Sequence, residues 1–369
     1  LNTVDILATR IGGDMLTFRR LSLLIIILLT VEYETGIAQS EATAEFLLIK
    51  PGGKANAMGG ANVALASDFW GTYYNPGAVG FTKSFSAGIY MSDEISAIYG
   101  ADYIYTGAVF RVPSIGVFGA SFTYFDLGEQ AWTDENGNNI GQFESYNAAF
   151  SILYARKFSE KLAIGASLKY IRMKFGAPNI GTIDIDGLGT SIAVDIGVLY
   201  KNVLPGLTFA PENIPGTFLS GIKPERFSRG ISFGLTIKNI GNRIKFADAA
   251  QADPIPTTLV AGLSYTPVEI GNLLSVRCTF DISKFLVNTG FSGADSTWRA
   301  DPWYKAVFTS WDDGFDEIMY GAEIDFLNIF ALRAGRHLQD HGLDYKTFGM
   351  RIGGEFLSMN IWSHFLPGN

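Results

Sequence analysis

Two histidines near the C-terminal end of the chain, His337 and His341, have the spacing of a metal-binding pair. On a helix, residues four apart share one face and could bind a metal ion together. Here the pair brackets the expected end of a strand and the start of a loop, where this spacing does not bring side chains together. The sequence therefore predicts no metal site at this position.

A second metal-like pattern, Asp134, Asn136 and Asn138, has the acidic and amide spacing with which a calcium loop begins. Such a loop needs Gly at its sixth position and Glu at its twelfth, but this chain has Asn139 and Ser145 there. The Asn-Gly dipeptide inside the pattern is typical of a tight hairpin turn. We therefore expect the tip of a hairpin and no calcium site.

No set of residues supports catalysis, and no cofactor is expected. The chain offers no defensible Ser-His-Asp order or carboxylate pair, and Gly52-Gly53-Lys54 lacks the spacing and the following Ser or Thr of a phosphate-binding loop. One Cys excludes an internal disulfide and a multi-cysteine zinc site. A net charge of −8 provides no broad basic face for nucleic acid. We expect a protein that is not an enzyme and binds no nucleic acid.

Aromatic and acidic residues gather in one long segment, residues 283–317. It is either a solvated loop or a surface that docks a partner or binds cations, because exposed aromatic residues beside charges often mark protein interfaces. The candidate docking residues are Trp298, Trp303, Trp311, Asp312, Asp313 and Asp316.

The composition and the N-terminal sequence indicate which kind of fold would position these residues. The 369 residues include 42 Gly, 14% are aromatic, and only 17% are charged, which excludes disorder and favours a barrel. Within residues 1–40, Arg19 and Arg20 precede an apolar run, Leu21–Val31, that is shorter than the roughly 20 residues of a spanning helix. These features predict upstream residues and a secretory signal peptide, cleaved between Ala38 and Ala44.

The rest of the chain alternates with a period of two residues. In residues 164–170, for example, Ile, Ala, Leu and Tyr alternate with Gly, Ser and Lys. In an exported chain this pattern predicts strands with an apolar face toward lipid and a small or charged face toward a lumen. We expect thirteen strands, at residues 84–91, 103–110, 115–127, 142–156, 161–174, 188–201, 230–239, 257–266, 274–282, 318–326, 329–337, 346–355 and 357–365.

Short and long connections alternate between these strands, as in bacterial barrels. Residues 202–229, which hold four Pro, break the alternation, and we expect an insertion there. Single-chain bacterial barrels have an even number of strands, so we expect about fourteen, with the last absent from this chain. Five residues fall on the lumen face of neighbouring C-terminal strands and predict a charge network that braces the barrel or holds a plug: Glu323, Asp325, Arg333, Arg351 and Glu355.

Residues 46–81 carry a combination of short motifs, among them Met58-Gly59-Gly60-Ala61 and Asn75-Pro76-Gly77-Ala78. Together with later blocks such as Tyr154–Phe158 and Phe233–Gly241, they make the chain resemble the PorV/PorQ family of outer-membrane proteins. These are relatives of the FadL-type fatty-acid transporters. Two departures are that Lys54 stands where Arg is common and that the last motif ends in Gly-Ala where the family has Ala-Gly.

The resemblance implies an all-β fold, a transmembrane antiparallel β-barrel of about 14 strands. It implies a hatch or plug at residues 41–83, followed by the barrel at 84–369 with the insertion at 202–229. The glycines of the hatch permit tight turns and close backbone approach, and irregular backbone lies at membrane depth only inside protein or water. The hatch motif residues are Gly52, Gly53, Met58, Gly59, Gly60, Asp68, Asn75, Pro76 and Gly77.

Two functions remain open, both in the bacterial outer membrane and in contact with its lipid. The first resembles the secretion-associated members, which act with type IX secretion, and implies exported or outer-membrane proteins as partners. The second resembles the FadL-type members and implies transport of a hydrophobic ligand such as a fatty acid. A structural barrel subunit of a surface assembly is a further alternative.

Overall fold

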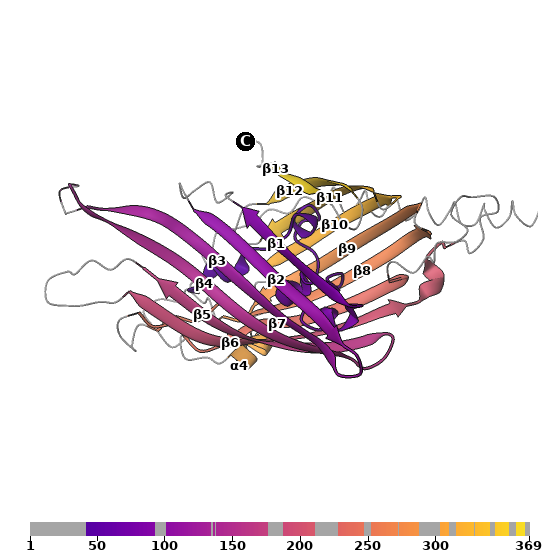
Figure 1. The fold of residues 1–369 in the computed structure, drawn as a ribbon, viewed down its shortest axis with the longest axis horizontal. Coiled ribbons are helices and arrows are strands. Elements are labelled where there is room, and N and C mark those ends of the chain that lie inside the picture. The colour runs from indigo at the N-terminus through magenta and orange to yellow at the C-terminus, as the bar shows by residue number, and fades with distance from the viewer. Residues whose placement is uncertain are drawn as a thin grey trace, which may run out of the picture. The chain divides into compact units, whose positions relative to one another are not determined.

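The computed structural model describes residues 42–92, 101–133, 136, 138–175, 187–210, 228–246, 252–271, 273–287, 303–309, 315–327, 329–339, 344–353 and 359–365. The predicted signal peptide lies outside these residues. The chain forms an antiparallel β-barrel whose thirteen strands follow one another in sequence order (Figure 1). The strands are β1 Phe85–Ser92, β2 Asp102–Val112, β3 Gly116–Thr133, β4 Asn139–Lys157, β5 Leu162–Lys174, β6 Leu188–Val203, β7 Gly230–Gly241, β8 Thr258–Ile270, β9 Leu274–Phe285, β10 Glu317–Phe326, β11 Phe330–Gln339, β12 Tyr345–Ile352 and β13 Met359–Phe365.

Each strand expected from the alternation is present, and most ends differ by only a few residues. The largest difference is at residues 128–141, predicted as a long loop. Here β3 and β4 continue to Thr133 and from Asn139, after a bulge between Asp126 and Glu129. A bulge admits an extra residue without ending the pairing, so polar sequence beyond it can remain strand. The described residues contain no fourteenth strand.

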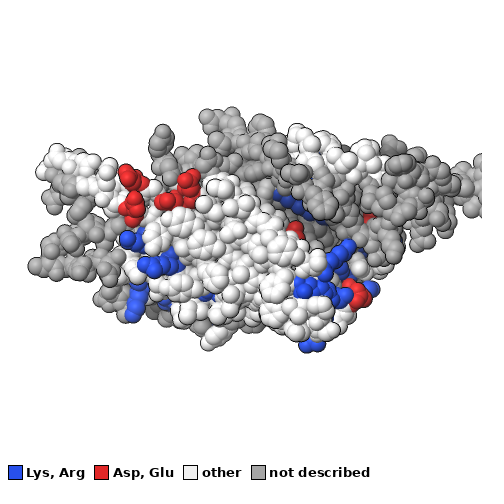
Figure 2. Space-filling model, viewed as in Figure 1, with Lys and Arg blue, Asp and Glu red and all other residues white. Residues whose placement is uncertain are grey.

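The two faces of the strands differ in exposure, residue by residue. Along β5, Ile164, Ala166, Leu168 and Tyr170 are exposed, whereas the residues between them are buried or half-buried. The same alternation runs through β6. Figure 2 shows the outcome on one face, where uncharged side chains cover the middle and charged side chains gather toward the two ends. The predicted apolar outward face and small or polar inward face are confirmed.

Residues 42–84 form the N-terminal segment, which contains four short helical turns: η1 Glu45–Leu48, α2 Gly53–Asn56, α3 Gly71–Tyr74 and η2 Ala78–Phe81. It is drawn in indigo in Figure 1. Its apolar side chains pack on the inward face of the sheet; Val79, for instance, joins Val109, Val117 and Leu153 in one buried cluster. The segment also contacts β10 and β12 by hydrogen bonds, so it meets strands from both halves of the chain.

Two further elements lie in the connections. In the predicted insertion at 202–229, β6 runs to Val203 and η3 Pro205–Leu207 follows, while residues 211–227 lie outside the described part. The long connection between β9 and β10 contains the helix α4, Trp303–Thr309. Among the described helices, none is long and apolar enough to cross a membrane.

Candidate functional site: the contact of the N-terminal segment with the strands

The backbone of the N-terminal segment lies directly on glycines of the strands. A Cβ on Gly197 of β6 would lie 3.0 Å from the Gly77 backbone nitrogen and 2.1 Å from the side-chain oxygen of Asn75, and one on Gly165 of β5 would lie 2.3 Å from the Pro76 carbonyl oxygen. Gly321 of β10 and Gly335 of β11 meet the backbone of Met58 in the same way. The glycines face each other in pairs, because Gly165 is opposite Gly197 and Gly321 is opposite Gly335. Only glycine leaves room for a second backbone at these positions.

Glycines of the N-terminal segment are constrained in turn. Gly59 has φ 71° and Gly60 has φ 88°, a region that other residues rarely adopt. A Cβ on Gly59 would lie 2.3 Å from the Arg336 carbonyl oxygen, and one on Gly77 would lie 2.4 Å from the Gly197 carbonyl oxygen. These positions of the Met-Gly-Gly and Asn-Pro-Gly motifs therefore have a physical requirement for glycine.

Asn75 joins the N-terminal segment to the barrel wall. Its amide nitrogen donates to the carbonyl oxygens of Val63 (2.9 Å) and Val198 (3.0 Å), and its Oδ1 accepts from Gly77 N at 2.9 Å. The side chain is fully buried and thus satisfies three backbone groups that water cannot reach. Asp68 differs, because it is exposed and accepts a local hydrogen bond from Trp70 N.

The remaining motif residues have simpler places. Gly52 has φ 105° and packs beneath Trp70, Gly53 begins α2, and Met58 is fully buried. Nearby, burial raises the pKa of Tyr73 and Tyr74 well above the usual value. Both stay neutral and donate to backbone carbonyl oxygens of the same segment.

Asp281 of β9 is a contact that the sequence did not reveal. One carboxylate oxygen, Oδ2, accepts from the backbone N–H groups of Asn62 (2.7 Å) and Val63 (2.9 Å). The side chain is buried. Since these partners lie more than 200 positions away in sequence, no local pattern points to them.

Four of the five predicted lumen charges come together around the strands β9 to β12. Arg333 Nε lies 2.7 Å from Glu323 Oε2, and Arg351 lies 2.5 Å from Asp325. The structure adds two cations that the prediction omitted: Arg277 of β9 at 3.5 Å and Lys54 of the N-terminal segment at 3.9 Å from Glu323. Glu355 lies outside the described residues.

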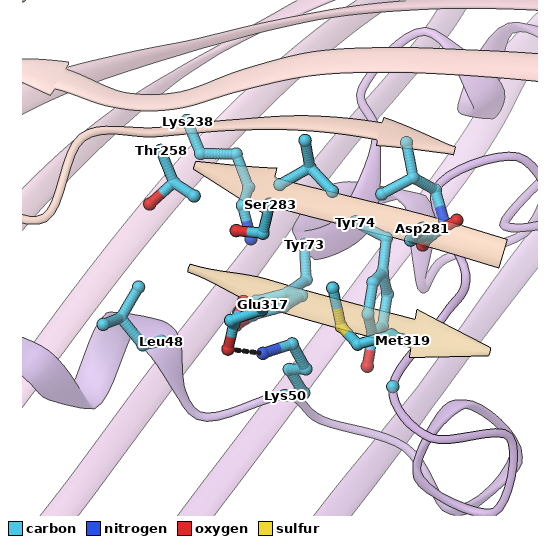
Figure 3. Close-up of a pocket in the computed structure, with 13 residues that line it drawn as sticks. Leu48, Lys50, Tyr73, Tyr74, Lys238, Thr258, Asp281, Ser283, Glu317 and Met319 are labelled. Atoms are coloured by element: carbon cyan, nitrogen blue, oxygen red, sulfur yellow. Dashed lines mark hydrogen bonds and ion pairs between the residues drawn. The ribbon is translucent and has the colours of Figure 1, made fainter. Parts of the chain in front are cut away.

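A second charged group links the N-terminal segment to β10 and β11. Lys50 Nζ lies 2.7 Å from Glu317 Oε1, and His337 Nε2 lies 3.2 Å from the same oxygen. In Figure 3 a dashed line joins Lys50 and Glu317. His337 Nδ1 is 2.7 Å from the Tyr345 hydroxyl. Glu317 is the last residue of the segment 283–317, which was expected to be a loop. In the structure it is the buried first residue of β10.

The predicted docking residues are described only in part. Trp298, Trp311, Asp312 and Asp313 lie outside the described residues, as does His341, and Trp303 begins α4. Asp316 is half-buried at the end of the connection, where its carboxylate accepts from Phe285 N at 2.7 Å and lies 3.4 Å from Lys284. Burial raises the pKa of Asp316, and the contacts with Phe285 and Lys284 oppose that shift. In the part of the chain that the structure describes, no group of three or more His, Cys, Asp or Glu could hold a metal ion.

Asp281→Asn should loosen the N-terminal segment, because hydrogen bonds to a charged acceptor are stronger than those to a neutral one by about 1 kcal/mol each. With two such bonds, we expect a loss of about 2 kcal/mol in the free energy of unfolding. Hydrogen exchange of the Asn62 and Val63 amides would measure it. The matched variant Asp102→Asn, at an exposed position of β2, should leave that exchange unchanged. Equal exchange of these two amides in both variants would contradict the role of Asp281 as their hydrogen-bond acceptor.

A model of the family described as type IX secretion system protein PorV matches residues 37–292. No curated protein gives a significant match. Similar solved structures include the Ralstonia pickettii toluene transporter TbuX (14% identity, 85% of this chain and 92% of that chain covered, TM-score 0.43). They also include the CymD monoaromatic hydrocarbon channel (13%, 86% and 94%, TM-score 0.42) and the P. putida toluene transporter TodX (12%, 84% and 90%, TM-score 0.43). The family match covers well over half of the 369 residues, and the chain belongs to the PorV family of type IX secretion system proteins.

Proposed function

We propose that this barrel is a non-enzymatic component of type IX secretion in the outer membrane, where it receives an exported protein and passes it on to surface attachment. The family match supports the secretion role. The exposed aromatic side chains of α4 are the main reason to propose a protein partner: Phe308 is 83% and Tyr304 is 59% exposed. Large exposed aromatic residues are common anchors of protein interfaces.

The outward apolar face supports the membrane placement. Leu168 is 48% exposed near the middle of β5 and would face lipid. Leu168→Arg should therefore destabilise the folded barrel in lipid by about 2–4 kcal/mol, the cost of Arg near the bilayer midplane. Unfolding by denaturant in lipid vesicles measures this. Phe158→Arg is the matched control, since Phe158 is exposed in the turn after β4. Similar losses of unfolding free energy for both variants would argue against a position of Leu168 near the bilayer midplane.

The partner proposal is tested by gentle detergent extraction of the native protein and mass spectrometry of what accompanies it. We expect a stoichiometric exported protein, reduced by the double variant Tyr304→Ala/Phe308→Ala. Leu207→Ala, which removes an exposed apolar side chain of η3 between β6 and β7, should retain the partner. A lone barrel carrying an apolar small molecule would instead favour transport of a hydrophobic ligand.

A further inference from the structure

A row of aromatic side chains crosses the outward face of β1 to β4, near the end at which β2 and β3 are joined. Phe85 pairs with Phe110, and Phe110 pairs with Phe118. Phe118 in turn pairs with Tyr154, and its ring centroid lies 5.8 Å from that of Phe110 and 5.2 Å from that of Tyr154. The Tyr154 hydroxyl donates to the Ile115 carbonyl oxygen in the β2–β3 turn at 2.8 Å. Girdles of aromatic residues mark the two membrane interfaces of a barrel, so this row is expected at the depth of the lipid head groups.

Basic residues lie just beyond this row and form the basic rim. Arg111 directly follows Phe110, and Arg156 stands two residues beyond Tyr154 on the same face of β4. One or two residues of a strand span roughly 3–7 Å, so these cations stay within the head-group layer. The rim consists of Lys83, Arg111, Arg156, Lys157, Lys161 and Lys201.

Backbone hydrogen bonds hold the parts of the rim next to one another. Lys201 N, at the end of β6, donates to the Lys161 carbonyl oxygen in the β4–β5 turn at 2.8 Å. Arg111 N, at the end of β2, donates at 2.7 Å to the carbonyl oxygen of Ser84, the neighbour of Lys83. The rim therefore runs continuously across the ends of several strands.

The charges of the rim act on a common carboxylate. Lys157 lies 2.6 Å from Glu160 and lowers the pKa of that carboxyl, and Lys201 and Arg111 lower it further. The cations of three connections thus lie near one acidic side chain. Glu160 is the only carboxylate in the part of this end that the structure describes without gaps, namely residues 82–85, 111–116, 155–163 and 200–204.

Most of the rim has positive charge that no described carboxylate balances. Lys157 is paired with Glu160, and Lys201 lies over the Phe81 ring at 4.0 Å. Four members are exposed and form no ion pair with any described residue: Lys83, Arg111, Arg156 and Lys161. Figure 2 shows basic side chains gathered at the lower right, over the end at which β2 and β3 are joined, whereas acidic side chains gather at the upper left.

The occupant of this surface must be anionic and must also cover the aromatic row. An anionic phospholipid meets both requirements, because its phosphate lies at the depth of the cations while its acyl chains contact the aromatic rings. An acidic protein in the periplasm would reach the cations, but the aromatic row faces the bilayer. The adjoining row therefore favours lipid over protein.

We propose that the basic rim binds the head groups of anionic phospholipids in the inner leaflet of the outer membrane. The rim lies at the end with the short connections, which in bacterial barrels face the periplasm. This inference does not depend on the secretion function, since it concerns the lipid around the barrel and not the cargo.

Titration of the purified full chain in neutral detergent with short-chain phosphatidylglycerol, followed by native mass spectrometry, tests the site. Short-chain phosphatidylcholine serves as the neutral comparison, and we expect tighter binding of phosphatidylglycerol. Arg156→Gln/Lys161→Gln should weaken that binding roughly ten-fold or more, because each cation near the head groups contributes several-fold to the affinity. Arg156→Lys/Lys161→Arg, which keeps both charges, should bind as the unaltered protein does.

The matched control removes the same two residue types from the opposite end of β5. Arg172 and Lys174 are exposed there, and Lys174 is opposite Tyr146, whose other neighbour is Asp126. Arg172→Gln/Lys174→Gln should leave the affinity for phosphatidylglycerol almost unchanged. Equal affinity of the unaltered protein for the two lipids, or an equal loss in the two glutamine variants, would overturn the proposal.

Discussion

Gly59→Val should release the N-terminal segment from the inner wall of the barrel. The new Cβ would lie 2.3 Å from the Arg336 carbonyl oxygen, and φ 71° is a strained conformation for a β-branched residue. The strain costs about 1–2 kcal/mol and the overlap about 1–3 kcal/mol, so the segment should lose roughly 2–5 kcal/mol of docking free energy. Cleavage by trypsin after Lys54, followed by mass spectrometry, measures the release.

The control for this variant is Gly206→Val. Gly206 lies in η3, where a Cβ would meet no atom within 4 Å and φ is not positive. We expect the cleavage pattern of the unaltered protein. If Gly59→Val were cleaved no faster than Gly206→Val, the close backbone contact at Gly59 would have to be discarded.

Glu323→Ala is the second change with a large expected effect. It removes the carboxylate that faces Arg333 at 2.7 Å and Arg277 at 3.5 Å, and the Glu323 side chain is only 3% exposed. Removing one partner of a buried ion pair costs about 3–5 kcal/mol, because the remaining charge stays desolvated. We expect a loss of this size in the free energy of unfolding, measured with denaturant in detergent or lipid.

Glu160→Ala tests whether the loss of stability depends on the burial of the ion pair. Glu160 forms an ion pair of nearly the same length, 2.6 Å with Lys157, but its side chain is 88% exposed. Pairs in solvent contribute little, so this variant should unfold almost as the unaltered protein does. A comparable loss for both variants would show that the charge network does not depend on its burial.

The sequence predicted the strands well because each strand of a barrel carries its own period-two pattern. Exposure along β5 and β6 follows that pattern closely. The lumen face of Glu323 and Arg333 was predictable for the same reason. Their pairing was not, because it depends on register: Glu323 stands opposite Arg333 on one neighbour and opposite Arg277 on the other.

The contacts of the N-terminal segment were the least predictable part. Its motifs identified Gly59 and Asn75, but the partners of these residues in the barrel wall come from strands far along the chain. Asp281 and Glu317 each bind residues more than 200 positions away, and no local pattern points to those partners. Alternation along a strand shows which way a side chain points and says nothing about what it meets.

One hydrogen bond of the N-terminal segment spans most of the chain, and it bears on the order in which the barrel is assembled. Gly59 N donates to Thr347 Oγ of β12 at 3.0 Å, across 288 positions of sequence. Residues synthesised first therefore acquire a partner synthesised nearly last, and the closing of so long a loop is slow. Until β12 has joined the sheet, Gly59 lacks that anchor. Docking of the N-terminal segment is thus a late step, and it marks a barrel whose C-terminal strands are in place.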